Sequence, residues 1–323
     1  MASDFHLFHD HQFHLLPQFL RPRNFDCDLA LDGIRQMLWG FFKKVVVADN
    51  CALFVNGVFE NYQTLDGSTL FLGAFFFTIQ IYGDFSGYSD IAIGCARLFG
   101  IDLMQNFKYP YFSRDIAEFW RRWHISLTTW FRDYIYIPLG GSRAGKWKSF
   151  RNTLVIFLVS GFWHGANWTF VAWGAYHALL FLPLLLLGQN RRYRDSVAEN
   201  SFLPSVKELT QMGATFLLVL LGWILFRSED ISQAAVYLER MFNVSLFSAP
   251  QLVGLGFGQL LLKKCFFFTA LMFVVEWIGR KQAHGLMIED LSLPVRYVIY
   301  TVLLIIIYGF DASNPQGFIY FQF

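Results

Sequence analysis

The chain has 323 residues, of which 55% are hydrophobic and only 15% are charged, and its mean hydropathy is +0.38. Soluble domains average about 25% charged residues, so this composition argues against an ordinary soluble domain and predicts a protein with several membrane segments. The formal net charge of +2 is too small to indicate nucleic-acid binding, and no nucleic-acid partner is expected.

Residues 1–30 are polar and hold four of the eight histidines, and they are expected to form a loop or an interfacial segment. They lack the basic start and the apolar stretch of a signal peptide, so none is expected. The four histidines match no zinc-ligand spacing and no thiolate lies among them, so no metal site is expected. The four cysteines of the chain are widely separated, which predicts reduced packing residues rather than disulfides.

Three helical segments are predicted in the first third of the chain. Gly33–Asp49 is an amphipathic helix candidate that ends in the basic stretch Phe41–Lys44, as expected of a helix at the membrane interface. Thr69–Tyr82 is strongly apolar but short for a crossing. Ser86–Phe99 continues as a more mixed helix, rich in glycine and alanine.

Polar side chains gather at the junction of the last two segments, in Gly83–Asp90. The pattern is not Gly-x-Ser-x-Gly, so no nucleophile elbow is indicated. A polar helix junction is the default interpretation. The sharper alternative places Asp84 and Ser86 in the lining of a substrate cavity.

Asp115–Ile137 combines many aromatic residues with arginines and is too charged to face lipid, so it belongs at the interface or in a protein-lined cavity. On a continuous helix Trp120 and His124 would share one face, while Arg121 and Arg122 would point elsewhere. Arginines there could bind an anionic substrate such as the phosphates of a nucleotide-type carrier. Taken alone, the pattern favours the alternative of an interfacial helix with snorkelling arginines.

Between Arg151 and Arg191 the chain has no Asp, Glu, Lys or Arg. The run is too long for one crossing of a hydrocarbon core about 30 Å thick. It predicts a hairpin with limbs Asn152–His164 and Trp168–Gly188, and a turn near Gly165. Basic residues flank both ends, so both flanks are expected on the cytoplasmic side.

His164 lies at the predicted turn, inside the membrane profile. A buried imidazole stays neutral because desolvation disfavours its charged form, and a neutral imidazole can accept a proton as a general base. A neutral histidine bonded to a helix carbonyl is an equally good interpretation of an isolated position. The neighbours Gly161, Gly165 and Asn167 favour a broken helix that lines a cavity. His177, on the second limb, is expected to be a helix-contact residue.

The rest of the chain alternates apolar and amphipathic segments. Together these patterns predict an all-α, polytopic transmembrane helical bundle with short re-entrant and interfacial helices. Ser232–Phe242 is predicted as an amphipathic interfacial helix. The further apolar segments are Met212–Phe226, Leu252–Leu262, Phe266–Ile278 and Tyr297–Phe310.

Four motifs, in order and with matching spacing, resemble the membrane-bound O-acyltransferases, and within them the bacterial branch of alginate O-acetylation proteins. A D-alanyl-lipoteichoic-acid exporter is a relative of that branch. The resemblance runs from about residue 15 to 323, and the closing Phe318–Phe323 shares it. The motifs are Gly83–Asp90, Phe119–Leu127, Tyr136–Gly141 and Ser160–Ala166.

The resemblance implies a helix bundle around a central funnel, formed by residues 31–323. His164 matches the catalytic histidine of the family, and His124 matches its second active-site position. The activity implied is transfer of acetyl from acetyl-CoA or a similar thioester, with no bound cofactor, toward hydroxyls of a polysaccharide such as alginate. Residues expected to bind substrate are Arg121, Arg122, Trp123, Asp84, Ser86 and Asn167.

The family also implies a multi-pass protein of the cell inner membrane, with the lipid bilayer, a periplasmic acetyltransferase-type protein and the polysaccharide acceptor as partners. Family members usually carry several transmembrane segments before the stretch that corresponds to Leu15, and this chain starts there. Two alternatives stay open. A proton-coupled transporter or channel would need acidic partners at membrane depth, which the charge-free run does not supply. An inactive fragment would act only as an assembly partner.

Overall fold

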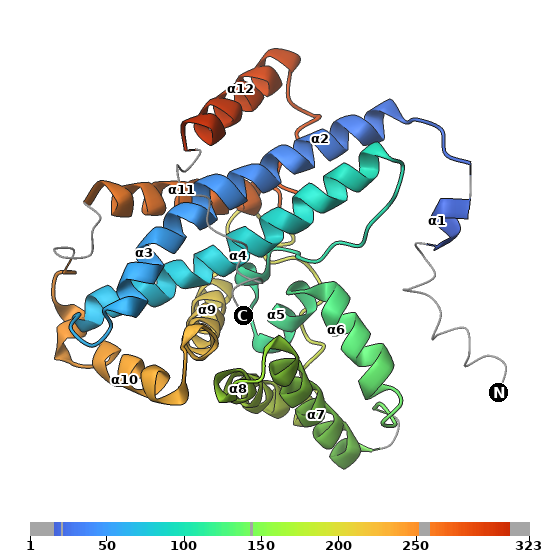
Figure 1. Ribbon diagram of the computed structural model, residues 1–323. Helices are drawn as coiled ribbons and strands as arrows, with labels where there is room; N and C mark the ends of the chain where they lie inside the picture. The colour runs from blue at the N-terminus through green and yellow to red at the C-terminus, as the bar shows by residue number, and fades with distance from the viewer. Residues whose placement is uncertain (1–15, 21, 143–144, 252–258, 311–323) are drawn as a thin grey trace.

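The computed structural model describes residues 16–20, 22–142, 145–251 and 259–310. Within these ranges the regular elements are all helical, which confirms the predicted all-α class (Figure 1). Two π-helical segments and two 3-10 turns interrupt the α-helices, at Phe42–Ala48, Arg132–Tyr136, Pro110–Phe112 and Val244–Phe247. The α-helices are α1 (Leu16–Leu20), α2 (Cys27–Phe41), α3 (Asp49–Glu60), α4 (Gly67–Leu98), α5 (Ile116–Arg122), α6 (Ile125–Phe131), α7 (Lys146–His164), α8 (Trp168–Leu186), α9 (Val206–Arg227), α10 (Ile231–Met241), α11 (Gln259–Ile278) and α12 (Leu293–Gly309).

The longest helix is α4, which joins the two segments predicted at 69–82 and 86–99 into one element of 32 residues. Its length is about 48 Å at 1.5 Å per residue. Asp66 caps its start, because the carboxylate accepts a hydrogen bond from the Thr69 N–H at 2.9 Å. The predicted junction at 83–90 is therefore the middle of a continuous helix, where the polar side chains face neighbouring helices.

Helix α2 runs alongside α4 (Figure 1). Two glycines permit this close approach: a Cβ at Gly94 would lie 2.3 Å from the backbone oxygen of Gly33, and one at Gly33 would lie 2.6 Å from that of Gly94. The helix predicted at 33–49 belongs to a longer helical stretch, in which α2, the π-helical segment and α3 follow one another from Cys27 to Glu60.

Lys43 and Lys44 are buried, so the prediction that they form the basic end of an interfacial helix is wrong. The ammonium nitrogen of Lys43 lies 2.6 Å from a carboxylate oxygen of Asp90, and that of Lys44 lies 2.6 Å from one of Asp84. Acidic residues on the neighbouring helix α4 thus compensate both charges inside the protein. Opposite charges make such burial tolerable, because an unpaired buried ion would cost several kcal/mol.

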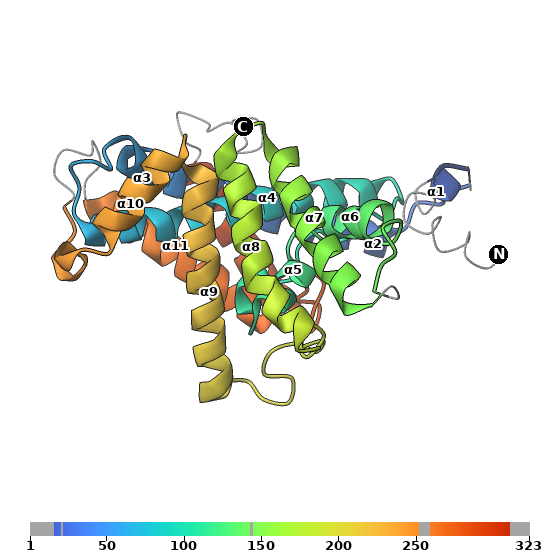
Figure 2. The ribbon, with the colours of Figure 1, turned by 90° about the horizontal axis from the view of Figure 1, so that it is seen from below.

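The charge-free run forms the predicted hairpin, with α7 and α8 packed against each other and the turn at residues 165–167. Helices α8 and α9 pack side by side as well, and in Figure 2 the start of α9 extends beyond the rest of the bundle. In the described part of the chain, α8 and α9 are the two helices of at least 18 residues that are apolar enough to cross a membrane.

The C-terminal third also follows the predicted order. Helix α10 matches the amphipathic segment predicted at 232–242, and α12 matches the apolar segment at 297–310. The segment predicted at 252–262 falls partly outside the described residues, and its described part belongs to α11 together with the segment at 266–278. The N-terminal histidines and the motif at 318–323 also lie outside the described residues.

Candidate active site

His164 is the last residue of α7 and stands at the turn of the α7–α8 hairpin. The two helices cross closely because glycines meet backbone at the crossing. A Cβ at Gly161 would lie 2.3 Å from the backbone oxygen of Phe170, and a Cβ at Gly174 would lie 2.2 Å from that of Phe157. The sequence therefore fixes His164 at the tight end of the hairpin.

Asn167 begins the second limb. Its side-chain oxygen accepts a hydrogen bond from the Thr169 N–H at 3.1 Å, which caps α8, and its amide donates to the Glu229 carbonyl at 2.6 Å. Both ends of the side chain are thus engaged within the protein. With these two hydrogen bonds Asn167 fixes the turn beside His164. Its contact with substrate remains a prediction.

His124 lies at a break between α5 and α6, so the prediction of one helix through this region is wrong. The residue adopts a left-handed conformation, with φ of 44° and ψ of 56°, at the N-cap of α6. Asn106 supplies the missing partners for the start of that helix. Its carbonyl accepts from the Ile125 N–H at 2.9 Å, and its side-chain oxygen accepts from the Ser126 N–H at 3.3 Å.

The break brings His124 and His164 to the same cavity, 40 positions apart in sequence. This cavity has a volume of about 20 Å³, room for about one water-sized group. Its described lining is aromatic and apolar apart from hydroxyls and the two imidazoles, and includes no Asp, Glu, Lys or Arg. The lining residues are Ile81, Trp120, Trp123, His124, Leu127, Thr128, Phe131, Ser160, His164, Trp173, Trp223 and Phe226.

Aromatic rings hold both imidazoles. The His164 ring lies 5.3 Å from the Trp173 ring and 5.0 Å from that of Phe226, edge to face in both cases. His124 contacts Phe85 in the same way at 4.7 Å, and its Nδ1 lies 3.4 Å from the Ser126 hydroxyl. Burial, with the neighbouring His164 adding to it, lowers the pKa of His124 from its usual range to about 3. The His124 imidazole is therefore neutral at physiological pH.

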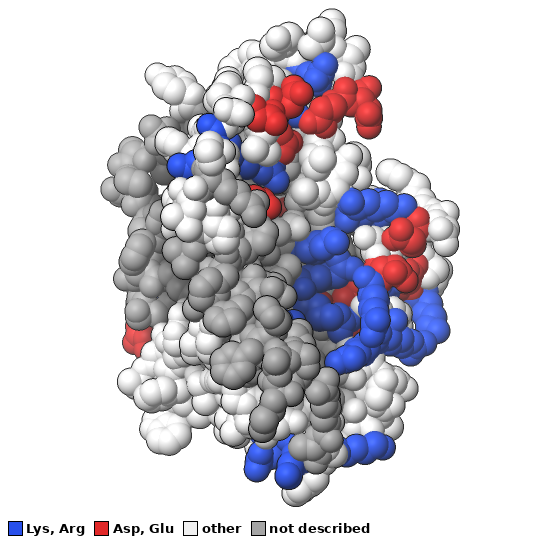
Figure 3. Space-filling model, turned by 90° about the vertical axis from the view of Figure 1, so that its right-hand side faces the viewer, with Lys and Arg blue, Asp and Glu red and all other residues white. Residues whose placement is uncertain are grey.

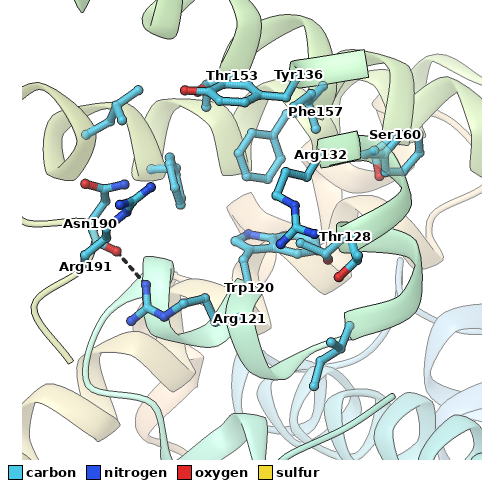
Figure 4. Close-up of a pocket in the computed structure, with 16 residues that line it drawn as sticks. Trp120, Arg121, Thr128, Arg132, Tyr136, Thr153, Phe157, Ser160, Asn190 and Arg191 are labelled. Carbon is cyan, nitrogen blue, oxygen red and sulfur yellow. Dashed lines mark hydrogen bonds between the residues drawn. The ribbon is translucent and has the colours of Figure 1, made fainter. Parts of the chain in front are cut away.

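A larger cavity of about 470 Å³ adjoins the small one (Figure 4). Trp120, Thr128, Phe131 and Ser160 line both cavities and so form the wall between them. Figure 4 shows Arg121 and Arg191 on one side of the large cavity, Ser160 on the other, and Trp120 with Arg132 between them. The remaining lining is mostly apolar. The volume lies within the range of small-molecule sites, about 300–1,000 Å³.

A third, basic pocket of about 350 Å³ opens beside the large cavity and shares Arg121 and Arg191 with it. Figure 3 shows Lys and Arg side chains gathered on one face of the molecule. The Arg121 guanidinium donates to the Asn190 carbonyl at 2.5 Å, which ties the chain after α8 to α5. The pocket is lined by Lys108, Arg121, Arg122, Arg191, Tyr193, Arg194 and Ser196.

The two predicted arginines have different surroundings. Arg122 is buried and forms two hydrogen bonds, of 2.8 and 3.1 Å, to one carboxylate oxygen of Glu118. It also donates to the Lys108 carbonyl at 3.1 Å. Arg121 is more exposed and lies at the junction of the large cavity and the basic pocket. Arg121 therefore has the better position for an incoming anion, and Arg122 mainly anchors α5.

Asp84 and Ser86 do not line the histidine cavity and belong instead to a separate cluster of polar side chains with Lys43 and Lys44. The Ser86 hydroxyl accepts a hydrogen bond from the Lys43 ammonium at 2.9 Å, and Asp84 pairs with Lys44. Both side chains are buried, and both of these lysines lie on the π-helical segment Phe42–Ala48 that packs against α4. Of the residues predicted for the site, the structure brings together His164, His124 and Trp123, with Arg121 at the approach.

Within the described residues, these features define a helical, membrane-type protein with a pair of partly buried histidines next to an apolar cavity with a basic mouth. The chain matches the model of the membrane-bound O-acyltransferase family over residues 34–202, and it belongs to that family. The matched region contains both histidines, the α7–α8 hairpin and every residue that lines the large cavity.

The chain is similar to proteins that are named for alginate, peptidoglycan and teichoic acid. The chain is 40% identical over 253 residues to a probable alginate O-acetylase of Pseudomonas aeruginosa, covering 77% of this chain and 46% of the relative. It is 36% identical over 242 residues to a peptidoglycan O-acetyltransferase of Helicobacter pylori, covering 73% and 44%. It is 29% identical over 214 residues to a teichoic acid D-alanyltransferase of Bacillus subtilis, covering 62% and 52%. The chain spans about half the length of these relatives.

Several residues of the site gave no signal in the sequence. Trp173 and Thr128 resemble ordinary residues of apolar helices, and only the meeting of α5, α6, α7 and α8 places them around the histidines. Arg191 was recognised as a basic flank but not as a cavity residue. A pairing of Gly161 with Gly174 across the hairpin was the one readable hint, because close helix crossings need small residues.

Proposed function

We propose that this chain carries the active site of a membrane O-acyltransferase, which passes an acetyl group from a thioester donor toward hydroxyls of an exported polysaccharide such as alginate. The observation that supports it best is the shared cavity of His164 and His124, which adjoins a larger cavity with a basic mouth. The alginate and peptidoglycan O-acetylating relatives support the same class of reaction.

In this proposal His164 is the general base. It takes the proton of the acceptor hydroxyl as the hydroxyl oxygen attacks the carbonyl carbon of the thioester. The tetrahedral intermediate then expels the thiolate, which recovers the proton from His164 and leaves as a thiol. His124 is neutral, as its lowered pKa requires, and orients the reacting groups or stabilises developing charge by hydrogen bonding.

The donor we propose is acetyl-CoA or a similar acyl thioester, used as a co-substrate. Its phosphates would meet the basic pocket, where Arg121, Arg191 and Arg194 offer guanidinium groups suited to phosphate oxygens. The uncharged arm that carries the thioester would then lie in the large apolar cavity. This order delivers the thioester to the wall formed by Trp120 and Ser160, directly beside the histidine cavity.

We place the protein in the cell inner membrane as a multi-pass protein, with the basic pocket on the cytoplasmic side, where positive residues prefer to lie. The proposed partners are the lipid bilayer, a periplasmic acetyltransferase-type protein and the polysaccharide acceptor. Substrate-contact roles for Trp123, Asp84, Ser86 and Asn167 belong to this proposal as well. Trp123 lies closest to such a role, because it lines the cavity of the two histidines.

A proton-coupled transporter is the alternative function, because the buried carboxylates could serve as the acidic groups of a proton relay. Asp84 and Asp90 are paired with lysines, and Glu276 accepts a hydrogen bond from the Tyr82 hydroxyl at 2.9 Å. None of these groups lines the histidine cavity. A proton relay would need the acids and the histidines along one continuous path, so the geometry favours acyl transfer.

The test is acetyl transfer by the full chain with His164→Ala, followed as acetyl content of the exopolysaccharide and as thiol release from acetyl-CoA. Loss of the general base is expected to lower kcat by about 10²–10⁴-fold. Phe162→Ala is the matched control, because Phe162 lies on the same helix, is 65% exposed and does not line the cavity. Wild-type transfer by the His164→Ala protein would refute the proposal.

A further inference from the structure

Three tryptophans that line the histidine cavity carry buried N–H groups with no hydrogen-bond partner among the described residues. They are Trp120, Trp173 and Trp223. An indole N–H can only donate. Leaving a buried donor unpaired costs about 1–3 kcal/mol, and native proteins pair the large majority of buried side-chain polar atoms. Unpaired donors in the wall of a cavity indicate that a bound molecule can accept from them during function.

Trp173 is placed closest to the proposed chemistry. It is only 1% exposed, and its ring lies 5.3 Å from the His164 ring at an interplanar angle of 90°. Trp120 lies 5.6 Å from Trp173 and belongs to the linings of both the small and the large cavity. The two indoles therefore flank the passage that a thioester would take toward His164.

The third indole has a different neighbour. Trp223 packs against Trp173 at 5.9 Å and stands beside the hydroxyl of Tyr111. That hydroxyl already donates to the Thr78 carbonyl at 2.6 Å. Trp223 is therefore buried in the same cavity wall as the other two tryptophans, but the Tyr111 hydroxyl lies beside it.

We propose that Trp173 and Trp120 form the oxyanion site of this enzyme, an inference that rests on the proposed function. Their N–H groups donate to the carbonyl oxygen of the acyl donor as the acceptor hydroxyl oxygen bonds to the carbonyl carbon. The hydroxyl proton passes to His164, and the negative charge that collects on the carbonyl oxygen is held by the two indoles. When the carbon–sulfur bond breaks, the charge leaves on the thiolate and the indole donors are released.

The surroundings suit neutral donors. The described lining of the cavity offers no Lys or Arg, so charge on the oxyanion has to be met by dipoles. Donors in a dry, low-dielectric site act more strongly than donors in water. Edge-to-face contacts with Phe157 and His177, at 5.4 and 5.0 Å from the Trp120 ring, fix that indole before substrate arrives. A donor that is already fixed needs no rearrangement in the transition state.

The experiment removes the N–H while keeping the ring shape. In the full chain, Trp173 is replaced by 3-benzothienylalanine, in which sulfur takes the place of the N–H, and Trp173→Phe serves as the genetic version. Removing an oxyanion donor is expected to lower kcat about 10²–10³-fold, with KM for acetyl-CoA changed by less than about threefold. The same replacement at Trp120 is expected to act in the same direction.

Trp223 provides the matched control, because the same replacement there alters the same cavity wall. If all three replacements lower kcat equally, the tryptophans act through packing and the oxyanion site is refuted. Wild-type kcat with the sulfur analogue at Trp173 also refutes it. In both cases the wild-type protein transfers acetyl, so the proposed function survives.

A second measurement needs no turnover. The indole N–H resonances of nitrogen-15-labelled protein are recorded with the ketone analogue of acetyl-CoA, in which a methylene replaces the sulfur. Downfield shifts of the Trp173 and Trp120 signals, with the Trp223 signal unmoved, support the donor pair even if no transfer is detected. Unshifted Trp173 and Trp120 signals in the presence of bound analogue refute it, whatever the outcome for transfer.

Discussion

His124 is not a glycine but adopts a left-handed backbone conformation. This conformation costs a residue with a side chain about 1–3 kcal/mol, and such residues cluster at functional sites. Asn106 stabilises this conformation by accepting from the first two N–H groups of α6. The consequence is chemical, because the left-handed turn separates α5 from α6 and lets His124 reach the cavity of His164. A regular helix would have carried the imidazole past it.

The basic pocket gives a prediction for single residues. Arg191→Ala and Arg194→Ala each remove a guanidinium from the pocket, and each is expected to raise KM for acetyl-CoA about tenfold, near 1.4 kcal/mol, with little change in kcat. Initial rates at varied donor concentration and two salt concentrations measure it. Arg192→Ala is the control, because Arg192 is exposed and is not part of the pocket lining. An equal change in all three variants would show that only the general charge of this loop matters.

The α7–α8 hairpin is the element that positions the proposed base. At the crossing each helix brings a glycine against the backbone of the other, so their fit depends on the absence of side chains at Gly161 and Gly174. In a lipid environment, close van der Waals packing replaces the hydrophobic effect as the force between helices. The hairpin therefore holds His164 by shape, while Asn167 fixes the turn through its cap and its bond to the Glu229 carbonyl.

Gly161→Ala tests this element. The added methyl would meet the Phe170 carbonyl oxygen at 2.3 Å, and backbone cannot move aside cheaply, so a loss of about 1–3 kcal/mol in the free energy of unfolding is expected. Thermal unfolding in detergent measures it, and acetyl transfer should fall with it as His164 shifts. Gly213→Ala in α9 is the control, because a Cβ there meets nothing within 4 Å, and alanine should stabilise that helix by about 1 kcal/mol. Unchanged stability and acetyl transfer in Gly161→Ala would contradict the tight helix crossing that the structure shows.

Across the whole molecule, a buried ionic cluster joins three parts of the chain. Lys43 follows α2, Asp90 lies on α4, and Glu276 lies on α11, with separations from the Lys43 nitrogen of 2.6 Å to Asp90 and 3.9 Å to Glu276. Tyr82 completes the cluster through its hydrogen bond to Glu276. Removal of one partner leaves an uncompensated buried charge. The cluster therefore favours the arrangement of the N-terminal and C-terminal helices in which its charges are paired.

Lys43→Met is expected to lower the free energy of unfolding by about 3–5 kcal/mol, because Asp90 and Glu276 lose their counter-charge. Adding Asp90→Asn to Lys43→Met should cost less than the sum of the two single changes, since the pair is removed together. Urea unfolding in detergent gives the three values. Lys207→Met, at an exposed position, is expected to change stability by less than about 0.5 kcal/mol. Strict additivity of Lys43→Met and Asp90→Asn would contradict the coupling.

Local patterns were enough for the helical class, for the charge-free hairpin with His164 at its turn, for the amphipathic helix α10 and for the family. Each of these depends on residues that are neighbours along the chain, and hydrophobic period and charge spacing report such neighbours directly. The same patterns misplaced Lys43 and Lys44, because the burial of these lysines depends on Asp90 and Asp84 of α4, which lie 47 and 40 positions further along the chain. They also missed the break at His124, which depends on Asn106.

The cavities belong to the tertiary structure alone. Arg121 and Arg191 are 70 positions apart, and they become one mouth only because the hairpin returns the chain to α5. Trp120, on α5, and Trp173, on α8, face the same cavity for the same reason. A sequence states which groups are available, whereas the distance between two groups far apart in the chain is fixed by how whole helices pack. The proposed base could be found from the sequence, and its donor cavity, basic mouth and indole donors could not.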